Sequence, residues 1–206
     1  MKFYLSSYRL GNKTEQLKKL VPYGNIGYVP NALDFSGADS ERRKRHIERD
    51  TADLESLGVN VELLDLRDYF SEQNGLLKKL QQLGAIFISG GNVFVLRQAM
   101  YLSGLDRILG QLRTGEDFLY AGYSAAGCVL SQDLSVYQIV DNATDTPYDE
   151  LDQIIWEGLS FLALAFMPHW QSDHKESADI DREVQRCKQL GIPYQTLRDG
   201  EVLIIE

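Results

Sequence analysis

Residues 118–128 read FLYAGYSAAGC, and they carry the clearest structural signal in the sequence. An apolar, strand-like run leads into Gly-Tyr-Ser-Ala-Ala, and a helix-compatible stretch follows. This order matches a nucleophile elbow, in which a strand turns so sharply into a helix that the neighbours of the nucleophile must be small. Gly122, Ala125 and Ala126 meet that demand, although Ala126 stands where the G-x-S-x-G pattern has glycine. The pattern predicts that Ser124 lies exposed at a helix N-terminus, where free N–H groups favour negative charge. A serine that only caps a helix in a small-residue turn is the alternative.

The chain on both sides of this segment alternates short apolar runs with longer amphipathic stretches, which is typical of βαβ units around a parallel sheet. We predict strands at 2–5, 25–29, 60–65, 85–89, 118–123, 162–166 and 202–205, and helices at 14–20, 40–57, 75–83, 93–110 and 175–190. No internal repeat or linker interrupts this pattern. We therefore expect one α/β domain over residues 1–206, with a mainly parallel sheet and helices on both faces.

The composition narrows the class of protein. The 206 residues carry a net charge of −9, which argues against a nucleic-acid partner because such binding depends on clustered Lys and Arg. The one dense basic run, RRKR at 42–45, lies between acidic residues in a predicted helix, and we interpret it as a solvated face. Two cysteines are too few for a disulfide framework, and no run approaches the roughly 20 apolar residues of a membrane span. We expect a cytoplasmic protein without membrane contact, either a monomer or a homodimer.

A serine nucleophile needs a general base, and the chain has three histidines. His169 follows an apolar run and Pro168, at a position where α/β sheets present active-site residues. It also lies downstream of Ser124, in the order expected of such hydrolases, so we predict that it is the base. A core histidine bonded to a backbone carbonyl is the alternative. His46 lies within the basic run's helix and is expected to be exposed.

A metal site offers a different interpretation of the same region. His169, Asp173 and His174 carry ligand atoms, but a spacing of five residues does not align two imidazoles on one helix face as a spacing of four does. We therefore predict no metal, and acyl transfer by a serine requires no organic cofactor.

Three segments together resemble the dipeptidase E (aspartyl dipeptidase) family of serine peptidases, which is related in fold to cyanophycinase and the class I glutamine amidotransferases. IFISGGNVF at 86–94 is similar to the family's strand ending in a Gly-Gly-Asn turn. GYSA at 122–125 is similar to its nucleophile elbow, and PHW at 168–170 to its Pro-His-aromatic element. The resemblance implies a class I glutamine amidotransferase-like fold, a Ser-His-acid triad, and an oxyanion hole formed by the N–H groups of Gly91 and Ala125.

The triad acid has two candidates. Asp141 follows the apolar pair at 139–140, as an acid at a strand end would, and it also matches an Asp-Asn/Asp pair of related sequences. Asp145 lies in a polar turn before Pro147, which resembles the Asp-x-Pro context of dipeptidase E. We predict Asp141 as the acid, within about 3 Å of a ring nitrogen of His169, and Asp145 as the alternative.

The resulting prediction is a serine-type hydrolase that cleaves small peptides through an acyl-enzyme. A related esterase or cyanophycinase-like hydrolase is one alternative. The other is a non-catalytic small-molecule binding protein that keeps the elbow as a relic, and the substituted Ala126 gives that interpretation weight.

Overall fold

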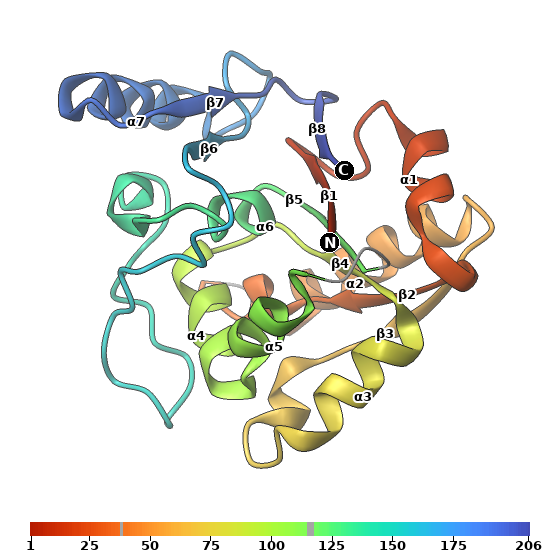
Figure 1. Ribbon diagram of the computed structural model, residues 1–206. Coiled ribbons are helices and arrows are strands. Elements are labelled where there is room, and N and C mark those ends of the chain that lie inside the picture. Colours follow the sequence, from red (N-terminus) through yellow and green to blue (C-terminus); the bar gives the residue numbers. More distant parts are fainter. Residues whose placement is uncertain (38, 115–117) are drawn as a thin grey trace.

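The computed structural model describes residues 1–37, 39–114 and 118–206, and among these residues six strands form a central sheet (Figure 1). The strand order is β3-β2-β4-β5-β1-β8. The strands are β1 (Lys2–Ser6), β2 (Asn25–Val29), β3 (Asn60–Leu63), β4 (Ala85–Ile88), β5 (Leu119–Tyr123) and β8 (Val202–Ile205). All neighbours pair in parallel except β8, which runs antiparallel to β1 at the edge. The predicted class, an α/β domain with a mostly parallel sheet, is confirmed.

Helices cover both faces of this sheet, which explains why its central strands are almost wholly apolar. β4 and β5 are buried along their whole length. Because side chains alternate across a strand, Phe87 packs with Leu17 of α1 and Leu54 of α2, whereas Ile86 and Ile88 face the opposite core with α3, α4 and α6. The helices are α1 (Thr14–Leu20), α2 (Ser40–Glu55), α3 (Asn74–Leu83), α4 (Val93–Ser103), α5 (Leu105–Leu112), α6 (Ala125–Cys128) and α7 (Ser177–Leu190), with 3₁₀ turns at Pro22–Gly24, Asn31–Leu33, Leu66–Tyr69 and Leu134–Tyr137.

One helix prediction needs correction. The helix predicted over 93–110 is two helices, because Gly104 adopts a left-handed φ of 73° that ends α4 and redirects the chain into α5. The helix predicted from residue 40 does begin at Ser40, and the Asp39 carboxylate caps it by accepting a hydrogen bond from the Arg42 N–H.

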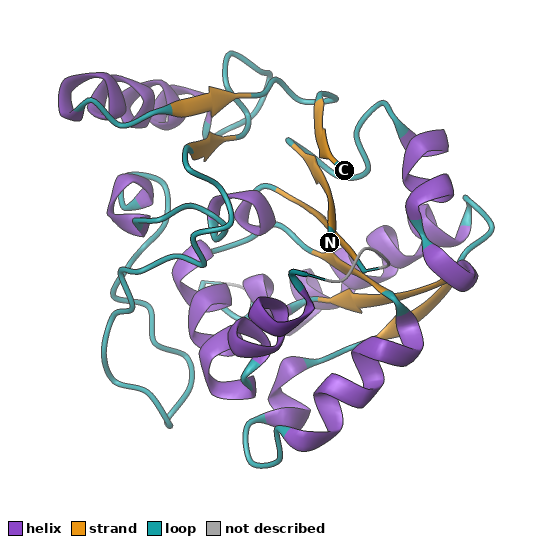
Figure 2. Ribbon diagram, viewed as in Figure 1, coloured by secondary structure: helices purple, strands orange, loops and turns teal. Residues whose placement is uncertain are grey.

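A small second sheet lies beside the main one (Figure 2). It pairs β6 (Ala165–Met167) in parallel with β7 (Tyr194–Thr196), and α7 connects the two strands. β6 begins three residues later than the predicted run at 162–166, and β7 was not predicted because three residues with exposed Gln195 at their centre carry no recognisable pattern. Both strands end close to the site described below.

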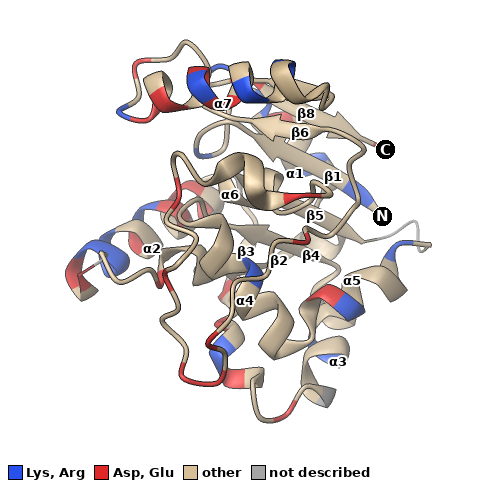
Figure 3. Cartoon of the chain, turned by 90° about the vertical axis from the view of Figure 1, so that its left-hand side faces the viewer, with Lys and Arg blue, Asp and Glu red and all other residues tan. Residues whose placement is uncertain are grey.

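Charged residues of both signs are interspersed along α2 and α7 (Figure 3). The basic run at the start of α2 is only partly the solvated face that was predicted. Arg43 pairs with Asp34 at 2.7 Å and with Asp65 at 3.0 Å, and the Arg42 guanidinium lies 5.4 Å from the Phe35 ring centroid. Within the described residues, no helix is long and apolar enough to cross a membrane.

Candidate active site

Ser124 stands at the turn between β5 and α6, with φ 52° and ψ −110°. A non-glycine residue in this region is strained, and such strain is typical of a nucleophile elbow. Gly122, at φ 157°, makes the turn possible, because a Cβ there would lie 2.5 Å from both the Ala126 Cβ and the Ile88 carbonyl oxygen. The missing Cβ of Gly122 also leaves the space that the Ala126 methyl group occupies. The departure from the G-x-S-x-G pattern is thus accommodated by packing.

The residue before the nucleophile is anchored in a polar network on the far face of the sheet. The Tyr123 hydroxyl donates a hydrogen bond of 2.8 Å to the buried carboxylate of Asp50, and the Tyr28 hydroxyl donates another of the same length. Arg49 neutralises Asp50 at 2.6 Å. A buried charge is stable only when it is paired and hydrogen-bonded, so these contacts fix the Tyr123 ring at the wall of the pocket that Ser124 also lines.

Two backbone N–H groups beside Ser124 are available to an oxyanion. Gly91, at φ 150°, must be glycine, since a Cβ would lie 2.1 Å from the Ala32 carbonyl oxygen. The next residue, Asn92, caps α4 by accepting a hydrogen bond of 2.8 Å from the Phe94 N–H. In the described chain, the N–H groups of Gly91 and Ala125 donate no hydrogen bond to protein. Preorganised free donors of this kind are what an oxyanion hole requires.

His169 follows β6 and Pro168, and its ring is almost fully buried, with φ 57° for the residue. Its backbone N–H donates to the Ser7 hydroxyl oxygen at 2.8 Å, and its Nδ1 lies 2.7 Å from the Asp199 Oδ1. Ser7 in turn donates to the same Asp199 oxygen at 2.9 Å. Burial lowers the pKa of His169 below its usual value, and the charge of His174 lowers it further, although Asp199 acts in the opposite direction.

The carboxylate that contacts the His169 ring is Asp199, and the described structure shows no hydrogen bond between that ring and Asp141, the acid predicted from sequence. Asp199 follows β7, and the Leu197 N–H donates to the Met167 carbonyl oxygen at 2.9 Å, which brings the ends of β7 and β6 together. A 3₁₀ helix at Leu134–Tyr137 and a turn over 138–140 precede Asp141 in place of a strand, so no strand end delivers that carboxylate to His169. The sequence signal for Asp199 was its turn-forming pair with Gly200, but nothing local distinguished it from a surface turn.

The two carboxylates considered as acids have other partners. Asp141 Oδ2 accepts a hydrogen bond of 2.8 Å from the Val93 N–H at the start of α4. Asp145 Oδ2 accepts one of 3.0 Å from the Ser36 N–H. In the described structure neither carboxylate forms an ion pair or hydrogen bond with His169. Burial raises the pKa of Asp141 to about 7.

His174 stacks directly on His169, with ring centroids 3.8 Å apart and planes 9° from parallel. Together with Glu176, the two histidines offer possible metal-ligand atoms within 4.8 Å of one another, and Asp173 of the predicted alternative is not part of this group. Stacked rings direct their in-plane lone pairs side by side, whereas a tetrahedral ion needs lone pairs that converge. The arrangement thus suits a ring-positioning contact better than a metal centre.

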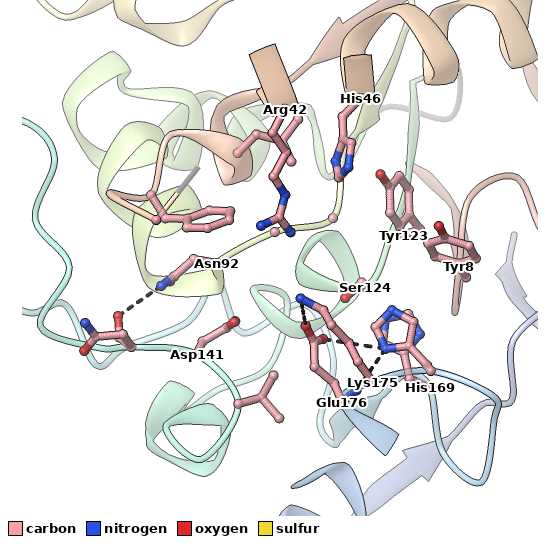
Figure 4. Close-up of a pocket in the computed structure, with 18 of the residues that line it drawn as sticks. Tyr8, Arg42, His46, Asn92, Tyr123, Ser124, Asp141, His169, Lys175 and Glu176 are labelled. Carbon is pink, nitrogen blue, oxygen red and sulfur yellow. Dashed lines mark hydrogen bonds and ion pairs between the residues drawn. The ribbon is translucent and has the colours of Figure 1, made fainter. Parts of the chain in front are cut away.

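A pocket of about 590 Å³ opens above Ser124 (Figure 4). Arg42 and His46 reach in from α2 on one side, and Asp141 lies across from them with the ion pair of Lys175 and Glu176. His46 was expected to be exposed, but it is partly buried, and its Nδ1 has no hydrogen-bond partner among the described residues. Ser124 and His169 line this pocket together without a hydrogen bond between their side chains in the described structure. Catalytic hydrogen bonds are often long before substrate binds.

The known proteins that this chain resembles include three peptidases. The chain is 29% identical over 129 residues to the Uncharacterized peptidase Lmo0363 of Listeria monocytogenes serovar 1/2a, an alignment that covers 62% of this chain and 58% of that relative's length. A crystal structure of a candidate peptidase E protein from Listeria monocytogenes EGD-e has a TM-score of 0.73 at 20% identity, covering 100% of this chain and 98% of the other. A peptidase from an acI-B1 Actinobacterium has a TM-score of 0.62 at 16% identity, covering 100% and 83%.

The two crystal structures establish the likeness in fold. The sequence pattern of peptidase family S51 matches residues 10–206, which is nearly the whole chain. The resemblance found in the three sequence segments is thereby confirmed, and the chain belongs to peptidase family S51, the dipeptidase E family of serine peptidases.

Proposed function

We propose that this protein cleaves very small peptides with a triad of Ser124, His169 and Asp199. The observation that carries the proposal is the 2.7 Å contact between the buried His169 ring and Asp199, in a pocket that the elbow serine also lines. A triad is recognised by such geometry and by the role of each group, whatever the order of the residues along the chain.

The reaction is acyl transfer. His169 Nε2 accepts the hydroxyl proton as Ser124 Oγ attacks the scissile carbonyl carbon, and the N–H groups of Gly91 and Ala125 donate to the oxygen that becomes negative. His169 then gives the proton to the leaving amine, and a water molecule repeats both steps on the acyl-enzyme to release the acid. Asp199 accepts from Nδ1–H throughout, so it fixes the tautomer and stabilises the imidazolium.

The size of the pocket supports a small substrate. Its volume of about 590 Å³ lies in the range of sites that enclose small molecules. Charged side chains on opposite walls also favour a short zwitterion over an apolar ester.

Labelling with a fluorophosphonate, combined with dipeptide hydrolysis, tests the proposal. The wild-type protein should be labelled at Ser124 and should hydrolyse dipeptides, and Ser124→Ala should abolish both while leaving the melting temperature nearly unchanged. Ser71→Ala is the control, because it removes an exposed hydroxyl that is not among the residues lining the pocket, and it should behave as wild type. A wild-type protein that is neither labelled nor active on dipeptides would favour a relic binding pocket, and activity on esters alone would favour an esterase.

A further inference from the structure

We propose that Glu183 of α7 keeps its proton in the working enzyme and forms a neutral wall beside the oxyanion hole, so that losing this proton at alkaline pH slows attack by Ser124. The inference rests on the proposed function, because it concerns the surroundings of the oxyanion that this attack creates. It gives a role to a buried acid that the proposed triad does not use.

Glu183 shares a small cavity with the groups proposed to carry the reaction. The cavity measures about 20 Å³, which is room for one water molecule, and its lining includes Ser124, His169 and both oxyanion donors, Gly91 and Ala125. Glu183 reaches this cavity from α7, and its side chain is fully buried. A charge on Glu183 would therefore act on the oxyanion across a space that holds almost no water to screen it.

The carboxyl group of Glu183 has a hydrogen-bond donor on one side and no counter-ion. Its Oε1 accepts a hydrogen bond of 3.1 Å from the Val140 N–H, whereas its Oε2 has no hydrogen-bond partner among the described residues. In the described chain no Lys, Arg or His forms an ion pair with this group: Arg182 of α7 pairs with Asp179 at 2.7 Å, and Arg186 pairs with no acid. A carboxylate in this position would be a buried charge without a cation, which is costly. A neutral acid avoids that cost, because its C=O still accepts from Val140 and its O–H turns toward the cavity.

The second acid on this cavity helps to keep the proton on Glu183. Burial raises the pKa of Glu183 to about 8; the Val140 N–H lowers it, and the charge of Asp141 raises it. Asp141 lines the same cavity and has a pKa of about 7, which burial raises above its usual value. Two carboxyl groups beside one small cavity do not ionise together easily, so Asp141 ionises first and its charge then opposes ionisation of Glu183.

The other titratable groups around Glu183 supply no cation to it. Glu176 and His169 also line the cavity, but the first pairs with Lys175 at 3.3 Å and the second contacts Asp199 at 2.7 Å. The remaining groups that face Glu183 from the elements packed around it are neutral or acidic: Tyr137 of the 3₁₀ turn, Cys128 of α6, and Asp179 and Cys187 of α7. Each of them disfavours a negative charge on Glu183 or leaves it unbalanced.

This arrangement sets the expected dependence on pH. Ionised Glu183 would add a negative charge beside the point where the substrate oxygen becomes negative, and like charges in a poorly solvated site raise the energy of that transition state. The rate of attack should therefore fall as the pH rises through about 8. Stability should decline as well. The pKa of Glu183 is higher in the folded than in the unfolded chain, so the stability that its proton provides is complete below about 4.3, the pKa of a free glutamate, and is lost as the pH rises to about 8.

The test follows the rate of fluorophosphonate labelling of Ser124 from pH 7 to 10, because this probe carries no titratable group and its oxygen would occupy the oxyanion hole. Wild type and the control Asp181→Asn, which changes an exposed acid of the same helix, should lose about tenfold in rate. Glu183→Gln should stay within a few-fold, since glutamine remains neutral and its amide oxygen still accepts from the Val140 N–H. The melting temperature should also fall less between pH 5 and 9 in Glu183→Gln than in wild type.

Two outcomes would overturn the inference and leave the proposed function intact. One is a wild-type labelling rate that stays constant from pH 7 to 10, and the other is an alkaline fall of equal size in Glu183→Gln. If Glu183→Gln does not fold, carbon-13 NMR of the glutamate carboxyl groups of wild type decides: one group still protonated at pH 6 supports the inference, and complete ionisation at that pH overturns it. Absence of labelling in wild type at every pH would instead refute the proposed function, and this inference with it.

Discussion

Ser124 and His169 share an uncommon backbone conformation, with φ values of 52° and 57°, but they are held in different ways. The turn at Ser124 depends chiefly on small residues next to it in sequence, Gly122 and Ala126, and its N–H also donates to the Ser6 carbonyl oxygen at 3.2 Å. The turn at His169 is held by Ser7, which lies 162 residues away along the chain, and by Asp199, which lies 30 residues away.

Because Ser124 and His169 are held in these different ways, mutations around them should have different consequences for stability and for rate. A turn that depends on close packing of its own residues is distorted when one of them becomes too large, and the free energy of unfolding then falls as well as the rate. A ring held by distant hydrogen bonds loses its orientation when a distant partner is removed, while the rest of the fold keeps its packing.

The largest effect is expected at the acid. Asp199→Asn keeps the shape of the side chain but removes the charge that stabilises the imidazolium, so kcat should fall by about 10⁴-fold, the loss that the same change causes in a trypsin-type triad. The melting temperature should change little, because Asp199 is partly exposed. Steady-state kinetics and a thermal melt measure the two quantities. A loss of less than tenfold would show that His169 works without this partner.

The next effect is expected at the elbow and should appear in stability as well as activity. Gly122→Ala places a Cβ 2.5 Å from the Ala126 Cβ and the Ile88 carbonyl oxygen, at a φ that alanine rarely adopts. We expect the free energy of unfolding to fall by about 2 kcal/mol, with a substantial loss of rate. Denaturant titration measures the first and peptide hydrolysis the second.

Gly110→Ala is the matched control, because this helical glycine has no atom within 4 Å of the added Cβ. It should raise the free energy of unfolding by about 0.5–1 kcal/mol and leave the rate unchanged. If Gly122→Ala were as harmless as Gly110→Ala, the close packing of the elbow would not constrain the sequence.

A smaller effect is expected from the distant anchor of the base. Ser7→Ala removes the hydroxyl that accepts from the His169 N–H and donates to Asp199. We expect kcat to fall about tenfold, on the scale of one or two hydrogen bonds, with the fold intact. Ser7→Thr retains the hydroxyl and should recover much of the rate. Equal losses for alanine and threonine would indicate a packing role for Ser7.

The same contrast explains how much was predictable from sequence. The elbow and the strands around it depend on local spacing, so β5 and the small residues after Ser124 were recognised. The break of α4 at Gly104 was missed because an isolated glycine is tolerated in many helices. Asp199 was missed because its role depends on β7, whose three residues pair with β6 from across α7. Tertiary contacts of this kind leave no periodic signal.

The smallest effect concerns the ring that stacks on His169. The pKa of His169 is lowered first by burial and then by the charge of His174, whereas Asp199 and Glu176 raise it. The base must be neutral to accept a proton, so kcat/KM should rise with pH through a midpoint below about 6.5, the ordinary histidine pKa. His174→Phe preserves a flat ring in contact at the 3.8 Å spacing but removes the repelling charge, so the midpoint should move upward by a fraction of a pH unit.

The plateau rate separates charge from packing in this last experiment. His174→Phe should keep the plateau of kcat/KM within a few-fold of wild type, because the stacked contact remains. His174→Ala removes both the charge and the contact, so its midpoint should also rise while its plateau falls further than that of the phenylalanine variant. A profile between pH 5 and 8 for all three proteins measures both quantities. A midpoint that stays fixed in both variants would show that His174 does not set the pKa of the base. Burial and the long-range contacts with Ser7 and Asp199 would then be enough to explain the position and pKa of His169.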